Sequence, residues 1–227
     1  MINNKLNLKC FCEKAFIALI LFFIITNAVI QKDSAIAVIS AICGILYTFL
    51  AGKGLPICYL FGITGSSFYG LLSFQNALWG NLILYIGYYL PMQILGYFKW
   101  SKNLQDNKKE IIKIKLPPKE LFSLIFILSI LSIAICFLLK HFNDSKPILD
   151  SITTVFSIGG MYLTVRRAIE QWIFWMIVNT LSFFMWIAVA LNGIKVYSTI
   201  IMWGVYLILA IYFYITWNKE IKEKNLQ

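Results

Sequence analysis

The chain has 227 residues, of which 60% are apolar and 13% are charged, and it carries a net charge of +10. Soluble domains average ~45–50% apolar and ~25% charged residues, and a soluble fold of this length cannot bury so much apolar surface. The basic residues lie mostly in short segments between apolar runs, which excludes a contiguous basic face for nucleic acid. This composition indicates an all-α membrane protein.

Eight apolar runs follow one another along the chain, each close to the ~20 residues that a spanning helix needs. In chain order, the predicted spans are Lys14–Ile30, Ser34–Ala51, Leu55–Phe74, Ala77–Lys99, Glu120–Leu139, Ile148–Val165, Gln171–Leu191 and Tyr197–Trp217. The first run follows lysines, as a signal peptide would, but cleavage near Ala35–Ala37 would cut into the second span. We therefore expect the first run to be a retained helix.

The distribution of basic residues tests this topology. With the N-terminus in the cytoplasm, the inside segments hold 16 of the 20 Lys and Arg residues. The outside segments hold only Lys32, Lys140, Lys146 and Lys195. Inside loops of membrane proteins carry this excess of positive charge. We predict a multi-pass membrane protein, with both termini and the segment Ser101–Lys119 in the cytoplasm.

An internal repeat appears when the chain is shifted by 117 residues. The matching residues include Asp33 and Ser34 with Asp150 and Ser151, and Gly87, Tyr89 and Trp100 with Gly204, Tyr206 and Trp217. The helices between these matches show no identities at this shift. Because four spans separate equivalent helices, the two three-helix units point the same way across the membrane. Parallel repeats are typical of transporters that bind substrate between the repeats.

The repeat predicts one transmembrane domain over residues 1–227 with five parts. These are an extra N-terminal helix in residues 1–32, a first three-helix repeat in 33–100, a loop and linker helix in 101–140, a second repeat in 148–217 and a tail in 218–227.

Enzymatic chemistry has no candidate residues. His141 is the only histidine and lies beside Lys140 in a predicted outside loop, and no His, Cys and carboxylate cluster has metal-ligand spacing. We expect no catalytic residue, no metal and no cofactor. The spans also lack acidic or basic residues at mid-depth, where such residues mark proton or ion paths. Their absence favours uncoupled movement of a substrate down its gradient.

The seventh span contains a polar and aromatic stripe. Trp172, Trp175 and Asn179 lie at positions i, i+3 and i+7, which place them within a ~60° arc of one helical face. Such a face suits a flat heterocycle, because the rings stack on it and the amide bonds its polar edge. Two alternatives remain: Trp172 is an interfacial-belt residue, or Asn179 bonds a neighbouring helix.

The fourth span contains a second candidate face. Tyr85, Tyr89 and Gln93 recur every fourth residue, and Gln93 could instead bond a neighbouring helix. Pro91 removes a backbone hydrogen bond and is expected to bend the helix. Trp217, at the end of the last span, is expected to be an interfacial-belt residue.

At these residues the sequence resembles the PnuC family of bacterial nicotinamide riboside transporters, from about Asp33 to Trp217. The segment that carries the resemblance is Glu170-Gln-Trp172-x-x-Trp175-x-x-x-Asn179, preceded by Arg166-Arg167 and supported by Tyr89, Gly96 and Trp100. The resemblance implies a 3+1+3 arrangement, similar to that of the SWEET sugar transporters, often with an extra N-terminal helix. It also implies facilitated diffusion, trapping of the vitamin by a cytoplasmic kinase, and a pocket that includes Trp172, Trp175 and Asn179.

One departure from the family bears on the substrate. Many relatives carry a Gln three residues before the tyrosine that matches Tyr89, where this chain has Ile86. Gln93, one turn after Tyr89, is expected to take its place. Nicotinamide riboside is the favoured substrate, with thiamine or another vitamin or nucleoside as the alternative. A non-transporting membrane scaffold is the rival of another class, and the sequence leaves room for a homo-oligomer.

Overall fold

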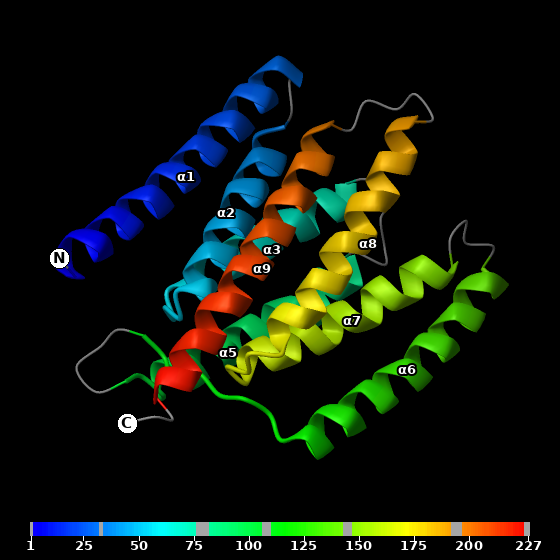
Figure 1. Cartoon of the computed structure of the whole chain (residues 1–227). Coiled ribbons are helices and arrows are strands. Elements are labelled where there is room, and N and C mark those ends of the chain that lie inside the picture. The colour runs from blue at the N-terminus through cyan, green and yellow to red at the C-terminus, as the bar shows by residue number, and fades with distance from the viewer. Residues whose placement is uncertain are drawn as a thin grey trace.

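The structure is a computed structural model that describes residues 2–31, 34–75, 82–105, 110–142, 147–191 and 197–224 (Figure 1). Within these ranges the chain is helical and has no β-strand. Its elements are α1 (Ile2–Gln31), α2 (Ala35–Gly52), α3 (Cys58–Gln75), η1 (Ile83–Tyr89), α5 (Leu90–Ser101), α6 (Pro118–His141), α7 (Pro147–Val165), α8 (Gln171–Leu191) and α9 (Tyr197–Lys224). The predicted all-α membrane fold and its sequence of helices are confirmed.

The helices differ in length and hydropathy. Of the helices that the structure describes, four are long and apolar enough to cross a membrane, namely α2, α6, α7 and residues Ile200–Lys224 of α9. Shorter apolar stretches lie in α1 (Ala15–Ile30) and α8 (Gln171–Met185). The helices α3 and α5 are more polar, because they carry glycine, serine, tyrosine and Gln93.

Six segments form a closed ring. Each packs on the next in the order α2, α3, η1–α5, α7, α8 and α9, and α9 returns to α2. The first three segments form one repeat and the last three form the other. Outside this ring, α1 lies along α2 and α6 lies along α7, at opposite flanks of the molecule (Figure 1).

The two repeats share an unusual turn. Gly54 and Arg167 adopt positive φ values of 72° and 64°, and they lie 113 positions apart. The amide of each donates to a carbonyl three residues earlier, Ala51 or Thr164, over 2.9 Å. A left-handed residue lets the chain reverse directly after a helix. The equivalence of these turns shows that α2–α3 corresponds to α7–α8 at an offset of 113.

The offset of 117 predicted from the sequence holds for the third helices, where Trp100 and Trp217 take equivalent places. For the first helices, whose structural offset is 113, an offset of 117 pairs residues that are about one helical turn out of register. This difference explains why the second helices show no identities at 117. Asp33, part of the predicted repeat match, lies outside the described residues.

Two tryptophans join the repeats reciprocally. The Trp100 indole, in the first repeat, donates to the Thr164 carbonyl over 2.9 Å, and the Trp217 indole, in the second, donates to the Gly52 carbonyl over 2.6 Å. Each carbonyl lies in the last turn of a helix, where the backbone has no helical partner. Both indoles are fully buried. The expectation that Trp217 is a belt residue is therefore wrong.

The linker between the repeats crosses the same end of the ring. The amide of Ile111 donates to Gly54 O over 2.9 Å, and the amide of Ile114 donates to Arg167 O over 3.0 Å. The linker amide of Leu116 donates to the buried Glu170 carboxylate at 3.2 Å. Residues 110–117 thus tie together the turns of both repeats.

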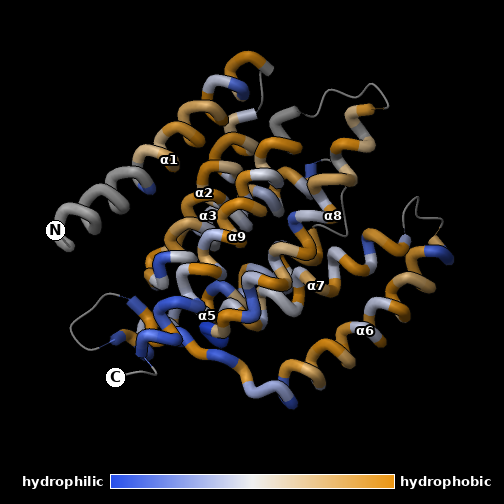
Figure 2. Tube along the Cα trace, viewed as in Figure 1, coloured by the Kyte–Doolittle hydropathy of each residue, from blue (hydrophilic) through white to orange (hydrophobic). Residues whose placement is uncertain are grey.

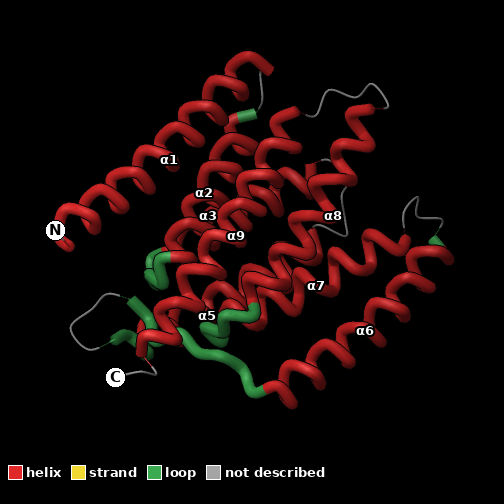
Figure 3. The backbone as a smooth tube through the Cα atoms, viewed as in Figure 1, coloured by secondary structure: helices red, strands yellow, loops and turns green. Residues whose placement is uncertain are grey.

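We call this end of the molecule the basic end. It comprises the turns at 53–57 and 166–170, the segment 110–117, and the end of α9. Hydrophilic residues gather there in Figure 2, and most of the described non-helical segments lie there in Figure 3. It is the end that the charge bias predicts to face the cytoplasm.

Candidate substrate site

The fourth predicted span contains a change of helix type. Residues Ile83–Tyr89 form the π-helix η1, and the Leu90 amide donates to the Tyr85 carbonyl, five residues earlier. Pro91 follows at the start of α5, where its missing N–H interrupts the α-helical pattern. Short π-helical turns occur often at functional sites, because they redirect side chains. Here the π-helix carries Tyr85 and Tyr89.

A largely aromatic cluster, called the aromatic cluster below, lies between the repeats. Its buried members are Tyr89, Met161 and Val165, and the residues packed against them include Tyr47, Tyr85 and Trp175. Tyr89 and Met161 are buried, and the rings of Tyr85 and Tyr89 meet edge to face at 4.9 Å. The Tyr47 hydroxyl lies 3.8 Å from the Met161 sulfur, across the interface of the repeats. The structure thus brings together three of the predicted site residues, Tyr85, Tyr89 and Trp175.

The Trp175 indole is held in a fixed orientation. Its Nε1 donates to the Thr164 hydroxyl over 3.2 Å. Its ring lies against Gly160, where an added Cβ would be 3.1 Å from the indole. Gly160 therefore gives the indole room to approach the α7 backbone. A half-buried ring held in this way can stack on a flat ligand without losing conformational freedom.

Gln93 is buried with an unused acceptor. Its side chain is 3% exposed, and its Oε1 has no hydrogen-bond partner among the described residues. The amide group lies against α3, where a Cβ added to Gly62 would meet Gln93 Nε2 at 3.1 Å and the Tyr47 ring at 2.8 Å. Leaving a buried acceptor unpaired costs ~1–3 kcal/mol, so this oxygen is suited to accept a bond from a ligand.

The two remaining predicted residues lie at different depths on α8. Asn179 is buried about one turn beyond Trp175. Trp172 is also buried, with its ring 5.5 Å from Phe213 and 5.6 Å from Trp217. It therefore belongs to the core of the basic end rather than to the aromatic cluster. An interfacial-belt role for Trp172 is excluded by its burial, and a binding role stays a prediction.

Sequence reasoning missed Tyr47, Met161 and Thr164. Tyr47 and Met161 lie inside apolar runs, where hydropathy treats them as ordinary span residues. Thr164 bonds its own helix at Gly160 O and also receives the Trp175 indole. The only sequence signal was a polar side chain within a span. No group of three or more metal-ligating side chains occurs in the described part of the chain.

Comparison with known proteins places this arrangement in a family. The model of the nicotinamide mononucleotide transporter family matches residues 34–219. The chain belongs to this family. Within it, the chain is a member of the PnuC group, because its curated relatives are named nicotinamide riboside transporter PnuC. The expectation of a membrane transporter rather than an enzyme is confirmed.

Two PnuC relatives are 31% identical to this chain. The protein of Neisseria mucosa aligns over 204 residues, 88% of this chain and 78% of its own length. That of Haemophilus influenzae aligns over 217 residues, 94% of this chain and 92% of its own. A crystal structure of the vitamin B3 transporter PnuC, 29% identical, superposes with a TM-score of 0.79 over 93% of this chain and 92% of that one.

Proposed function

We propose that this PnuC-family chain carries nicotinamide riboside across the membrane by facilitated diffusion. The names of the curated relatives support this substrate. Nicotinamide riboside has a flat, cationic pyridinium ring, and aromatic faces attract cations. The aromatic cluster offers such faces from both repeats.

The observation that carries the proposal is the unpartnered Gln93 oxygen beside the aromatic cluster. In the proposed complex, the substrate ring stacks on Trp175, and its carboxamide N–H₂ donates to Gln93 Oε1. Asn179 bonds another polar edge, and Tyr85 and Tyr89 complete the wall. Ile86 does not take part, because its side chain packs against Gly70 of α3.

The positions of the charged side chains support transport of the substrate without an energy source. Among the described helices of the ring, acidic and basic side chains lie only near the ends. Without a mid-span carboxylate or histidine, the site has no group to exchange a proton during transport. Accumulation above the outside concentration then needs removal of the free vitamin, and phosphorylation by a cytoplasmic kinase fits this role.

Uptake into liposomes tests this mechanism. Purified protein should equilibrate nicotinamide riboside without a proton or sodium gradient. Enclosed kinase and ATP should convert equilibration into accumulation. Concentrative uptake driven by an imposed gradient, with no kinase present, would contradict the proposal.

A thermal-shift screen against vitamins and nucleosides tests the substrate. A ligand that binds only the folded state raises the melting temperature. We expect the largest shift with nicotinamide riboside. A larger shift with thiamine would favour the alternative carrier, and no shift with any ligand would favour a scaffold.

The orientation in the inner membrane is part of the proposal, with the basic end in the cytoplasm. A reporter active only in the periplasm, fused after Gln227, should be silent. Strong activity of this fusion would contradict the proposed topology.

A further inference from the structure

Two seams join the repeats, one between α2 and α9 and one between α5 and α7. At the basic end, each seam has a cation directly after the first helix of a repeat. Lys53 lies over the Phe49 ring at 5.6 Å, and Arg166 lies over the Tyr162 ring at 5.8 Å. Lys53 and Arg166 are 113 positions apart, so they are repeat equivalents.

The α2–α9 seam is covered by α1. Glu13 of α1 forms an ion pair with Lys53 and accepts a hydrogen bond from the Tyr212 hydroxyl of α9. Further along α1, Ile17 and Ile20 are buried in the same core cluster as residues of α2 and α9. A helix of this chain therefore satisfies both the charge and the apolar surface of this seam.

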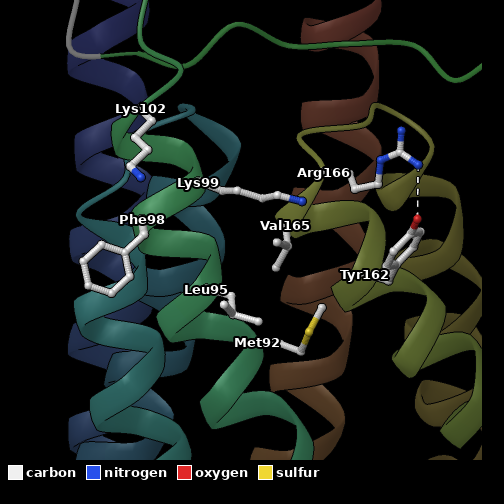
Figure 4. Close-up of a pocket in the computed structure, with 8 residues that line it drawn as sticks. All are labelled: Met92, Leu95, Phe98, Lys99, Lys102, Tyr162, Val165 and Arg166. Carbon is white, nitrogen blue, oxygen red and sulfur yellow. Dashed lines mark hydrogen bonds between the residues drawn. The ribbon is translucent and has the colours of Figure 1, made fainter.

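The α5–α7 seam has no such cover. Glu120 of α6 forms an ion pair with Arg166, but α6 packs along α7 rather than over the seam. A cavity of about 390 Å³ lies between α5 and α7 (Figure 4). This volume falls within the ~300–1,000 Å³ range of ligand sites in proteins.

The cavity has a charged half and an apolar half. Lys99, Lys102 and Arg166 lie toward the basic end, and Met92, Leu95 and Val165 line the other part. In Figure 4, Lys99 extends from α5 across the cavity toward Val165 and Arg166. Neither Lys99 nor Lys102 forms an ion pair with any carboxylate that the structure describes. After the Glu120–Arg166 pair is counted, the cavity keeps two positive charges, Lys99 and Lys102, without an ionic partner among the described residues.

We propose that the α5–α7 cavity binds one anionic phospholipid. Its phosphate lies between Lys99 and Lys102, and its acyl chain runs along Leu95 and Met92. Leu95 faces the outside of the ring, since it is 57% exposed while Gln93 and Gly96 of α5 are buried. Met92 is half-buried and packs against the cluster that contains the buried Val165, so these two residues form the inner wall of the cavity. Basic pockets between helices at the cytoplasmic side recognise anionic headgroups, and a soluble anion would leave the apolar half unused. The lipid would cover the α5–α7 seam as α1 covers the α2–α9 seam.

Thermal shift and native mass spectrometry of the purified protein in detergent test the site. Phosphatidylglycerol should raise the melting temperature, whereas phosphatidylcholine with the same acyl chains and inorganic phosphate should have less than half this effect. Mass spectrometry should detect one bound phosphatidylglycerol per chain. In the variant with Lys99→Gln and Lys102→Gln, at least half of the phosphatidylglycerol shift should be lost. Leu95→Trp, which fills the apolar half without changing charge, should lower the lipid occupancy.

The repeat supplies a matched control. Lys219 lies 117 positions after Lys102, and its side chain is 76% exposed near the end of α9. Lys219→Gln with Lys222→Gln removes the same charge from the same end and should keep the full shift. Equal shifts with phosphatidylcholine or inorganic phosphate would overturn the proposal, as would equal losses in both double variants. A change of oligomeric state in the Lys99–Lys102 variant would instead assign the seam to a second copy of the chain.

Discussion

The two repeats agree at their ends and differ in their middles. At the basic end, the left-handed turns at Gly54 and Arg167 correspond, and so do the indole bonds of Trp100 and Trp217. Even the ring contacts are alike, since Tyr59 meets Trp100 at 84° and Trp172 meets Trp217 at 85°. The scaffold is thus built twice from similar parts.

At the centre, large and small residues change places. The first repeat has Tyr47 on its first helix and Gly62 on its second, whereas the equivalent residues of the second repeat are Gly160 and Trp175. The space at Gly62 holds the Gln93 amide, and the space at Gly160 holds the Trp175 indole. The exchange gives one half of the proposed site an amide and the other half a ring that can stack on a ligand. An asymmetric ligand needs such a site, which a perfectly repeated sequence could not supply.

The largest expected effect is on thermal stability, and it tests whether the two repeats are equivalent at the basic end. Trp100→Phe and Trp217→Phe each remove an indole donor from a buried carbonyl and leave a small void. Losing the buried bond together with the packing of the larger ring should cost ~1–3 kcal/mol. The two variants should lower the melting temperature by similar amounts, measured by thermal unfolding in detergent. A large loss in one and none in the other would break the equivalence of the ends.

The next effect is on ligand affinity, and it tests the stacking role proposed for Trp175. Trp175→Ala removes the ring and should weaken nicotinamide riboside binding by at least tenfold, which corresponds to ~1.4 kcal/mol. Trp175→Phe keeps a ring and should be milder. Calorimetric titration measures both. Parent-like affinity of Trp175→Ala would remove this residue from the site.

Substitution of the two amide residues of the proposed site should change ligand affinity less. Gln93→Leu and Asn179→Leu each remove a hydrogen bond of ~0.5–1.5 kcal/mol, so affinity should fall by about two- to tenfold. Gln93→Leu should not lower the melting temperature of the free protein, because the amide oxygen has no partner among the described residues. If it destabilises the free protein without changing affinity, Gln93 has a structural role.

The smallest effect concerns the paired turns. Arg167→Gly makes the second turn like the first and relieves a left-handed conformation that costs a side chain ~1–2 kcal/mol. It also removes the bond from the guanidinium to Ile112 O at 3.3 Å. These changes oppose each other, so the melting temperature should move by only about 2 °C. Gly54→Ala, the matched control, gains no such relief and should be destabilising.

Much of this fold could be predicted from the sequence, because hydropathy and charge are patterns along the chain and need no knowledge of three-dimensional contacts. The eight apolar runs, the parallel repeat and the stripe from Trp172 to Asn179 were all visible there. The register of the first helices was not, since chance identities at 117 concealed the true offset of 113. The left-handed turn that fixes this offset has Gly in one repeat and Arg in the other, so no residue match marks it.

The candidate site was less predictable, because partners depend on three-dimensional contact. Trp172, Trp175 and Trp217 look alike in sequence, yet only Trp175 joins the aromatic cluster. Trp217 lies near the end of its span, as a belt residue would, but its indole finds a carbonyl of another helix. The site role of Gln93 rests on the space at Gly62, which becomes apparent only when α3 and α5 are packed together.

The ties at the basic end have a consequence for the populations of transport states. A state open at this end must give up the two indole bonds or replace them, and bonds of this kind are worth ~0.5–1.5 kcal/mol each. Where no other contacts replace these bonds, we expect this state to be a minor fraction of the molecules, and the apparent affinity for a ligand arriving from that side to fall by the same fraction. We therefore expect the proposed carrier to have unequal apparent affinities for the ligand on its two sides. Without coupling to an energy source, this inequality alters the rates of exchange and leaves the final distribution of the ligand unchanged.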